Sequence, residues 1–181
     1  MLLNQPIRQI AYFVDDVRAT VERHHKLFGS GPYFIMEDLR VPITYRGHDI
    51  ELSHTAAFGQ WGSMQVEIMR WESSPRSVIQ DFMPQGKTQS GFHHVAMLVD
   101  DLQATTADMN AAGFEEILRC PLQEWNMTAV FFDTMDAYGH FVEVYERVPP
   151  MVEFYDVVEK AARNFDGTDL FRDVPITSFR D

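Results

Sequence analysis

Four residues in the sequence combine side-chain types and spacing that suit a metal site. They are Gln9, Glu67, His94 and Glu143. Both glutamates lie within apolar segments, MQVEIM and FVEVYE, that read as strands. Glutamate is disfavoured inside a strand, and burying a carboxylate costs several kcal/mol unless a partner or a metal ion compensates it. Two carboxylates would balance a divalent cation, while imidazole and amide oxygen are neutral donors that leave room for water or substrate oxygens.

This mixed oxygen and nitrogen set narrows the choice of metal. It suits zinc, nickel, cobalt, manganese, iron or magnesium and argues against copper(I), which prefers sulfur. A structural zinc site would normally use thiolates, and Cys120 is the single cysteine in the chain. We therefore expect a divalent ion that keeps open coordination positions.

Each of these residues also has an ordinary structural interpretation. A strand glutamate can lie on a solvent face, and a buried His94 can be a hydrogen-bonded core residue. Gln9 is a candidate ligand only because it matches His94 in the repeat described next. Regular strand alternation would turn the neighbouring His93 to the opposite face, so we expect it to have a structural or supporting role.

An internal repeat relates the two halves of the chain. IRQIAYFVDDV at 7–17 lies over FHHVAMLVDDL at 92–102, 85 positions later. This alignment pairs Gln9 with His94, and matching the late segments SMQVEIMRW and GHFVEVYER, 76 positions apart, pairs Glu67 with Glu143. Alternating apolar residues predict a strand at the start of each copy, and helical spacing follows Val-Asp-Asp, whose aspartate suits a helix N-cap.

Both halves then read as strand, helix and three strands, which predicts an α+β protein of two βαβββ modules. We expect the first module over 1–73, a linker over 74–91, the second module over 92–148, and a C-terminal helix and tail over 149–181. The helix has the spacing to pack against a sheet or a second subunit.

Composition limits the partners. Lys plus Arg number 15 against 27 Asp plus Glu, a net charge of −12, which is the wrong sign for binding nucleic acid or an anionic membrane. No apolar run approaches the roughly 18 residues of a membrane span, and the N-terminus lacks a secretion-signal pattern. With a single cysteine, these features predict a soluble, cytoplasmic protein that acts on a small molecule.

The quoted segments resemble the vicinal oxygen chelate superfamily, which includes glyoxalase I, methylmalonyl-CoA epimerase, extradiol dioxygenases and bleomycin-binding proteins. The likeness covers about 7–147 through IAYFVDDV, MQVEIMRW and GHFVEVYE. The linker SPRSVIQDFMPQGKTQSG and the pair His93–His94 are most similar to the epimerase-like branch. The resemblance implies paired modules that form an open barrel around a metal ion, within one chain or between the chains of a homodimer.

The resemblance also carries over the four ligand positions. Epimerases usually have histidine where this chain has Gln9, so the ligand set is instead similar to that of eukaryotic glyoxalase I. Bleomycin-binding relatives lack the metal ligands, and dioxygenases use two histidines and one carboxylate, whereas this set holds only His94 as histidine.

Such a site favours a metal-dependent isomerase, epimerase or lyase that abstracts a proton next to a carbonyl through a metal-bound enolate. We expect Glu143 to act as the base, as the matching position often does in relatives, and Glu67 as the partner acid. Two alternatives remain open: a non-catalytic protein of the same fold that binds a small molecule, and an iron-dependent dioxygenase.

Aromatic and apolar residues on the predicted strands suggest a small apolar or aromatic substrate, although each could equally be core. The candidate substrate-binding residues are Phe13, Tyr45, His54, Phe58, Met69, Trp125, Phe132 and Tyr145. A CoA-linked substrate would instead need a basic patch. The candidates for such a patch are Arg40, Arg46, Arg70 and Arg76.

Overall fold

A computed structural model describes residues 4–73 and 90–175 of the chain. The first half contains β1 (Ile7–Phe13), α1 (Val17–Phe28), β2 (Tyr33–Tyr45), β3 (His48–Trp61) and β4 (Met64–Ser73). The second contains β5 (Gly91–Val99), α3 (Leu102–Ala111), β6 (Glu116–Leu122), the short helix η1 (Gln123–Trp125), β7 (Met127–Phe132), α4 (Met135–Tyr138) and β8 (Phe141–Glu146). The chain continues into α5 (Pro149–Ala162) and β9 (Phe171–Asp173).

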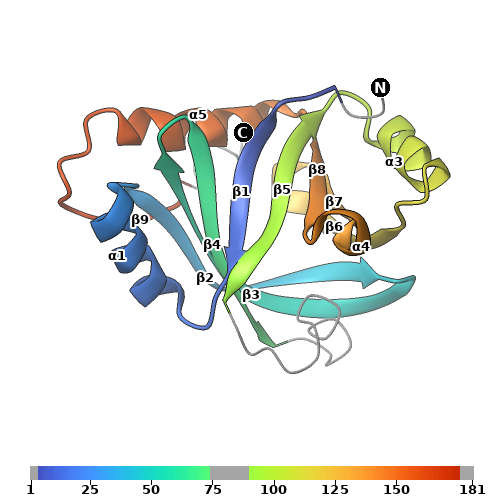
Figure 1. The fold of residues 1–181 in the computed structure, drawn as a ribbon, viewed down its shortest axis with the longest axis horizontal. Coiled ribbons are helices and arrows are strands. Elements are labelled where there is room, and N and C mark those ends of the chain that lie inside the picture. The colour runs from blue at the N-terminus through green and yellow to red at the C-terminus, as the bar shows by residue number, and fades with distance from the viewer. Residues whose placement is uncertain (1–3, 74–89, 176–181) are drawn as a thin grey trace.

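The strands confirm the α+β fold of two βαβββ modules. Within each module the first strand runs parallel to the last, β1 beside β4 and β5 beside β8. The antiparallel pair β1–β5 joins the two modules and runs down the centre of Figure 1. Helices α1 and α3 lie on either side of this central pair, one from each module.

The barrel is closed, whereas the resemblance implied an open one. The strand order β3-β4-β1-β5-β8-β7-β6-β2 returns to its start through the β2–β3 pair. Closure depends on the far end of β2, where Thr44 and Tyr45 pair with β6. Beyond it, the Arg46 backbone N–H donates to the Ile117 carbonyl, and the Arg46 guanidinium lies 3.1 Å from Glu115. The length of β2 therefore lets it reach β6 and close the ring.

Both repeat helices begin as the sequence predicts. The Asp16 side chain accepts the Ala19 N–H at the start of α1, and Asp101 accepts the Ala104 N–H at the start of α3. Each carboxylate satisfies a backbone donor that has no partner within the helix. Helix α1 ends at Gly29, which adopts a left-handed φ of 67° that glycine favours.

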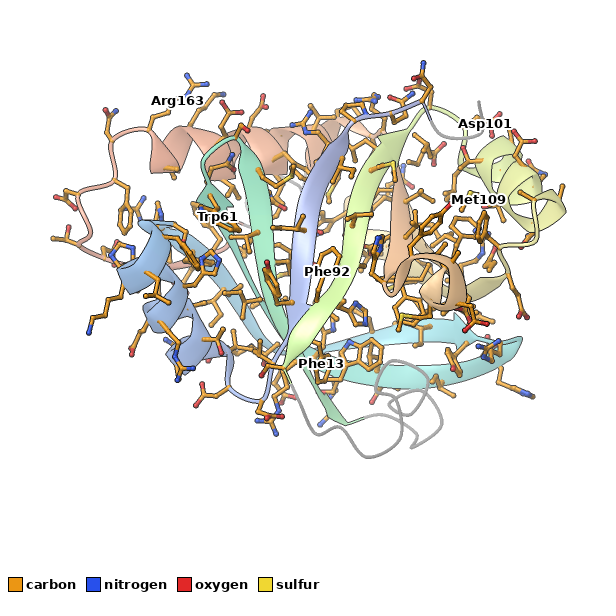
Figure 2. The ribbon with its side chains drawn as sticks, viewed as in Figure 1. Phe13, Trp61, Phe92, Asp101, Met109 and Arg163 are labelled. Atoms are coloured by element: carbon orange, nitrogen blue, oxygen red, sulfur yellow. The ribbon has the colours of Figure 1, made fainter. Side chains whose placement is uncertain are left out.

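Strand alternation divides the apolar residues between the barrel interior and the layers under the helices. Val142 and Val144 of β8 pack under α3 with Met109, which is labelled in Figure 2. Phe141 and Tyr145, which flank them on the same strand, belong to the interior cluster. The interior face is therefore the face that carries Glu143, as the alternation predicts.

Helix α5 runs along the top of the barrel in Figure 1 and completes its interior. Its buried residues are Met151, Phe154, Tyr155 and Val158. The Phe154 ring meets Phe58 of β3 edge-on with centroids 5.2 Å apart, and it lies 5.3 Å from Trp125. Among the described helices, none combines the length and hydropathy that a membrane crossing requires.

Candidate metal centre

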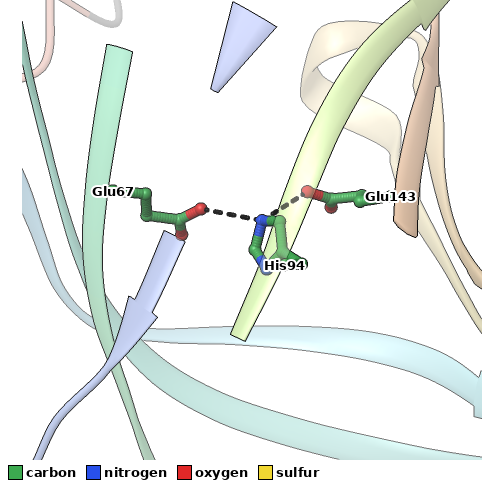
Figure 3. A group of neighbouring side chains, drawn as sticks. All are labelled: Glu67, His94 and Glu143. Carbon is green, nitrogen blue, oxygen red and sulfur yellow. Dashed lines mark ion pairs between the residues drawn. The ribbon is translucent and has the colours of Figure 1, made fainter. Parts of the chain in front are cut away.

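Three of the predicted ligands meet in the barrel interior. Glu67 on β4, His94 on β5 and Glu143 on β8 are buried, and one ligand atom from each lies within 4.8 Å of the others. The His94 Nε2 atom is 2.9 Å from Glu143 Oε2 and 3.4 Å from Glu67 Oε2. Figure 3 shows the imidazole between the two carboxylates.

Two alanines leave the space for this cluster. Ala11 on β1 is paired with Glu67 on one side and His94 on the other. Ala96 is likewise paired with Glu143. Both alanines are fully buried on the interior face, so their methyl groups keep the centre of the cluster free of bulkier side chains.

Gln9, the fourth predicted ligand, adjoins the cluster. Its Oε1 atom lies 3.4 Å from His94 Nε2, and its Nε2 atom donates to Gln65 Oε1 at 2.6 Å. This hydrogen bond turns the amide oxygen of Gln9 towards the imidazole. Gln65 was not a predicted site residue, although it shares a strand face with Glu67.

His93 lies on the interior side, contrary to the expectation from alternation. The β1–β5 register shifts between Ala11 and Tyr12, which pair with His94 and Phe92, so His93 is the extra residue of a β-bulge. Its ring contacts Phe13, Trp71, Phe131 and Phe141. The Nδ1 atoms of His93 and His94 are 2.7 Å apart.

The two carboxylates favour a positive charge between them. Burial lowers the pKa of His94, but the two carboxylates outweigh this effect and raise the pKa to about 9. Burial, and then the charge of His94, hold the pKa of His93 well below its usual range. Neutral His93 can therefore accept the hydrogen bond that His94 Nδ1 donates, which leaves the His94 Nε2 atom facing the carboxylates.

These residues fit a divalent ion. Two carboxylates balance its charge, and an imidazole whose second nitrogen is held by a hydrogen bond is typical of a metal ligand. Gln9 adds a neutral oxygen on the same side. Among the described residues, no other group of three His, Cys, Asp or Glu comes close enough to hold a metal.

Two tyrosines lie close to the carboxylates. The Tyr145 hydroxyl donates to Glu143 Oε2 at 2.6 Å, and burial, followed by the charge of Glu143, raises the pKa of this phenol. Burial and the same glutamate also raise the pKa of Tyr155 on α5. Helical spacing predicted the helix but did not indicate that one of its residues would approach the site.

A cavity of about 650 Å³ opens from the cluster. Glu67, His94 and Glu143 form part of its wall, and most of the remaining wall is apolar. Five of the predicted substrate-binding residues line it: His54, Phe58, Met69, Trp125 and Tyr145.

Three predicted substrate-binding residues do not line this cavity. Phe132 points to the other face of β7 and is fully buried under α3, whereas Phe131, whose Cα pairs with Glu143, lines the cavity. The prediction was wrong by one residue, which in a strand reverses the face. Phe13 and Tyr45 lie in the interior core cluster.

The predicted basic patch does not form among the described residues. Arg46 forms an ion pair with Glu115, and Arg70 donates to the Asp15 carbonyl. Neither arginine is part of the cavity wall. Arg40 lines the cavity, where its guanidinium lies 3.6 Å from Glu51. Arg76 lies outside the described residues.

The model of one protein family, described as the Glyoxalase/Bleomycin resistance protein/Dioxygenase superfamily, matches residues 8–132. A search of curated proteins gave no match. Among solved structures, a methylmalonyl-CoA epimerase is 16% identical with a TM-score of 0.52, covering 77% of this chain and 93% of its own. The epimerase from Mycobacterium tuberculosis is 18% identical with a TM-score of 0.50, covering 84% and 97%.

A hypothetical protein from Bacillus halodurans C-125 gives a TM-score of 0.57 at 18% identity, covering 81% of this chain and 96% of its own. At these identities the similarity shows a shared fold. Together with the family match, it accounts for the paired modules.

Proposed function

The chain belongs to the Glyoxalase/Bleomycin resistance protein/Dioxygenase superfamily, and on this basis we propose that it is a metal-dependent isomerase, epimerase or lyase. The proposed reaction moves a proton on a carbon next to a carbonyl group. One observation carries the proposal: the buried Glu67–His94–Glu143 cluster forms part of the wall of a cavity large enough for a small organic molecule.

Glu67, His94 and Glu143 would hold the ion, with Gln9 contributing its amide oxygen. A bound divalent ion supplies a Lewis acid that stabilises negative charge on a carbonyl oxygen. The bulge that brings His93 beside His94 fixes the ligand nitrogen in place. Ligand orientation of this kind typically changes metal affinity by 10- to 100-fold.

We assign Glu143 as the base and Glu67 as the partner acid. Glu143 takes the proton from carbon, and Glu67 delivers to the other face of that carbon a proton taken up from solvent. The Tyr145 hydroxyl bonds to Glu143 Oε2, which restrains the carboxylate while its second oxygen stays available. Both carboxylates reach the cavity, as this pair of roles requires.

Apolar and aromatic residues in the cavity wall support a small apolar or aromatic substrate. Phe58, Met69, Trp125 and Phe131 contribute large apolar surfaces. The epimerases named above act on methylmalonyl-CoA, but of the candidate arginines that the structure describes, only Arg40 lines this cavity. We therefore place apolar carbonyl compounds ahead of CoA thioesters.

The same apolar cavity supports a second candidate function, a non-catalytic protein that binds a small hydrophobic molecule. The two candidate functions differ in whether the protein catalyses exchange of the hydrogen next to the carbonyl for deuterium. The test incubates the protein, loaded in turn with zinc, nickel, cobalt and manganese, with a panel of aryl and alkyl α-hydroxyketones in D₂O. Proton NMR then follows the hydrogen next to the carbonyl.

Exchange of this hydrogen well above the rate with metal alone supports the enzyme. A protein that binds these compounds but leaves the exchange rate at background with every metal would contradict the proposed activity and favour the binding function.

A further inference from the structure

Two polar features of the cavity wall bear on ligand binding. One is the Glu67–His94–Glu143 cluster with Tyr145, which the proposed function uses. The other is His54 on β3, which lines the same cavity between apolar residues such as Leu52 and Phe58. A ligand that fills the cavity can therefore meet a second polar group besides the cluster.

The His54 Nδ1 atom is buried and has no hydrogen-bond partner among the described residues. A buried polar atom without a partner is costly, and most such atoms in folded proteins are satisfied. Because this residue lines a cavity, a bound molecule can supply the missing partner. Burial lowers the pKa of His54, opposed by the charge of Glu67, so the ring is neutral and offers one donor and one acceptor.

Strand pairing places His54 at a distance from the cluster. It is paired with Trp71, four residues along β4 from Glu67. At about 3.3 Å per residue, the two positions are separated by roughly 13 Å along the strand. The side chains between them on the interior face, Met69 and Ala56, are apolar.

The other charged residues that the structure describes on the cavity wall do not favour binding of an anionic group. They are Glu37, Arg40 and Asp173. Glu37 forms a bidentate pair with Arg18, and Arg40 has Glu51 as a neighbour. With one arginine and two carboxylates there, a phosphate or carboxylate on the ligand would gain little from this part of the wall.

We propose that His54 is a specificity-determining residue that hydrogen-bonds an uncharged polar group at the end of the substrate remote from the metal ligands. The substrate is then an elongated apolar or aromatic molecule, with oxygen donors at one end and a hydroxyl or carbonyl at the other. This inference rests on the proposed function, because the cluster must bind the first end.

Two pairs of aryl hydroxamates test the inference. Biphenyl-4-hydroxamic acid is compared with its 4′-hydroxy derivative, and benzohydroxamic acid with its 4-hydroxy derivative, by calorimetric titration of the zinc-loaded full chain. The hydroxamate anchors one end, and the two pairs place the hydroxyl group at two different distances from it. A hydrogen bond to His54 should make the hydroxylated member of at least one pair bind about three- to tenfold more tightly.

His54→Phe should abolish this preference while keeping the affinity for the unhydroxylated member. His54→Asn should retain part of the preference, because an amide can still donate and accept. His48→Phe is the matched control, since His48 is exposed at the start of the same strand, and it should behave as the parent does.

A parent protein without preference in either pair would overturn the inference, as would an unchanged preference in His54→Phe. If no hydroxamate binds the zinc-loaded parent, the chelating site of the proposed function fails as well. The two failures are therefore distinguishable.

Discussion

The adjacent residues His93 and His94 meet through their Nδ1 atoms, 2.7 Å apart, on the interior side of β5. Regular alternation would separate their side chains, and the bulge in the β1–β5 pairing brings them together. His93 consequently orients the ring that carries a candidate ligand nitrogen. The pair thus links an irregularity of the sheet to the chemistry of the cluster.

We expect His93→Phe to weaken metal binding by about 10- to 100-fold, because the Nδ1 atom of His94 loses its acceptor. Phenylalanine keeps the ring packing against the aromatic neighbours, so the fold should persist. Competition with a chromophoric chelator measures the affinity. His140→Phe serves as the control histidine, and equal affinities in both variants and the parent would refute this role of His93.

The metal-free protein should lose stability as the pH rises from about 6.5 to about 9. His94 has a folded-state pKa of about 9, above its ordinary 6.5, so its contribution is complete below pH 6.5 and disappears through pH 9. The loss should be on the order of a few kcal/mol in urea unfolding.

Two comparisons control this pH dependence. His94→Gln, which cannot be protonated, should lack the loss, and a bound divalent ion should remove it by replacing the proton between the carboxylates. If His94→Gln shows the same pH profile as the parent without metal, another group is responsible.

Substitution of each glutamate should have a different effect on proton exchange at the substrate carbon. With a substrate found in the deuterium screen, Glu143→Gln should slow abstraction by about 100-fold or more, because the base is lost. Glu67→Gln should still release the proton of one stereoisomer but should not invert the centre. Metal content is measured first in each variant, and Glu116→Gln, whose carboxylate pairs with Arg119, is the control. If both site variants exchange the proton at the rate of the parent protein, these roles are contradicted.

Phe131 and Phe132 allow a matched comparison on one strand. Phe132 is fully buried in the layer under α3, so Phe132→Ala should lower the free energy of unfolding by about 3–5 kcal/mol and leave ligand affinity unchanged. Phe131→Ala should instead weaken binding of biphenyl-4-hydroxamic acid, because Phe131 lines the cavity. Urea unfolding and calorimetry measure the two effects, and the reverse pattern would contradict the strand orientation.

The repeat explains why much of the fold was predictable. Matching positions in the two halves predicted the module order, both aspartate caps and the convergence of Glu67, His94 and Glu143. A period of two is enough to assign faces where the pairing is regular. Phe141 and Tyr145, each two residues from Glu143, accordingly share its face of the strand.

The remaining features depend on contacts that one sequence does not reveal. The bulge at His93 follows from how β1 and β5 pair, and closure of the barrel depends on how far β2 extends towards β6. Phe131 and Phe132 are chemically identical, so only the register of β7 decides which one lines the cavity. The approach of Tyr155 to the carboxylates likewise requires the packing of α5 across the barrel.

Metal content tests the proposed site most directly. Purified, tag-free protein is dialysed against metal-free buffer after loading with zinc, nickel, manganese or iron, and is analysed beside Gln9→Ala, His94→Ala, Glu143→Ala and the exposed-histidine control His48→Ala. We expect about one ion per chain in the parent and in His48→Ala, and a marked loss in the three site variants. A parent that retains no ion after any loading, or a His94→Ala variant that retains as much as the parent, would contradict a metal centre at these residues.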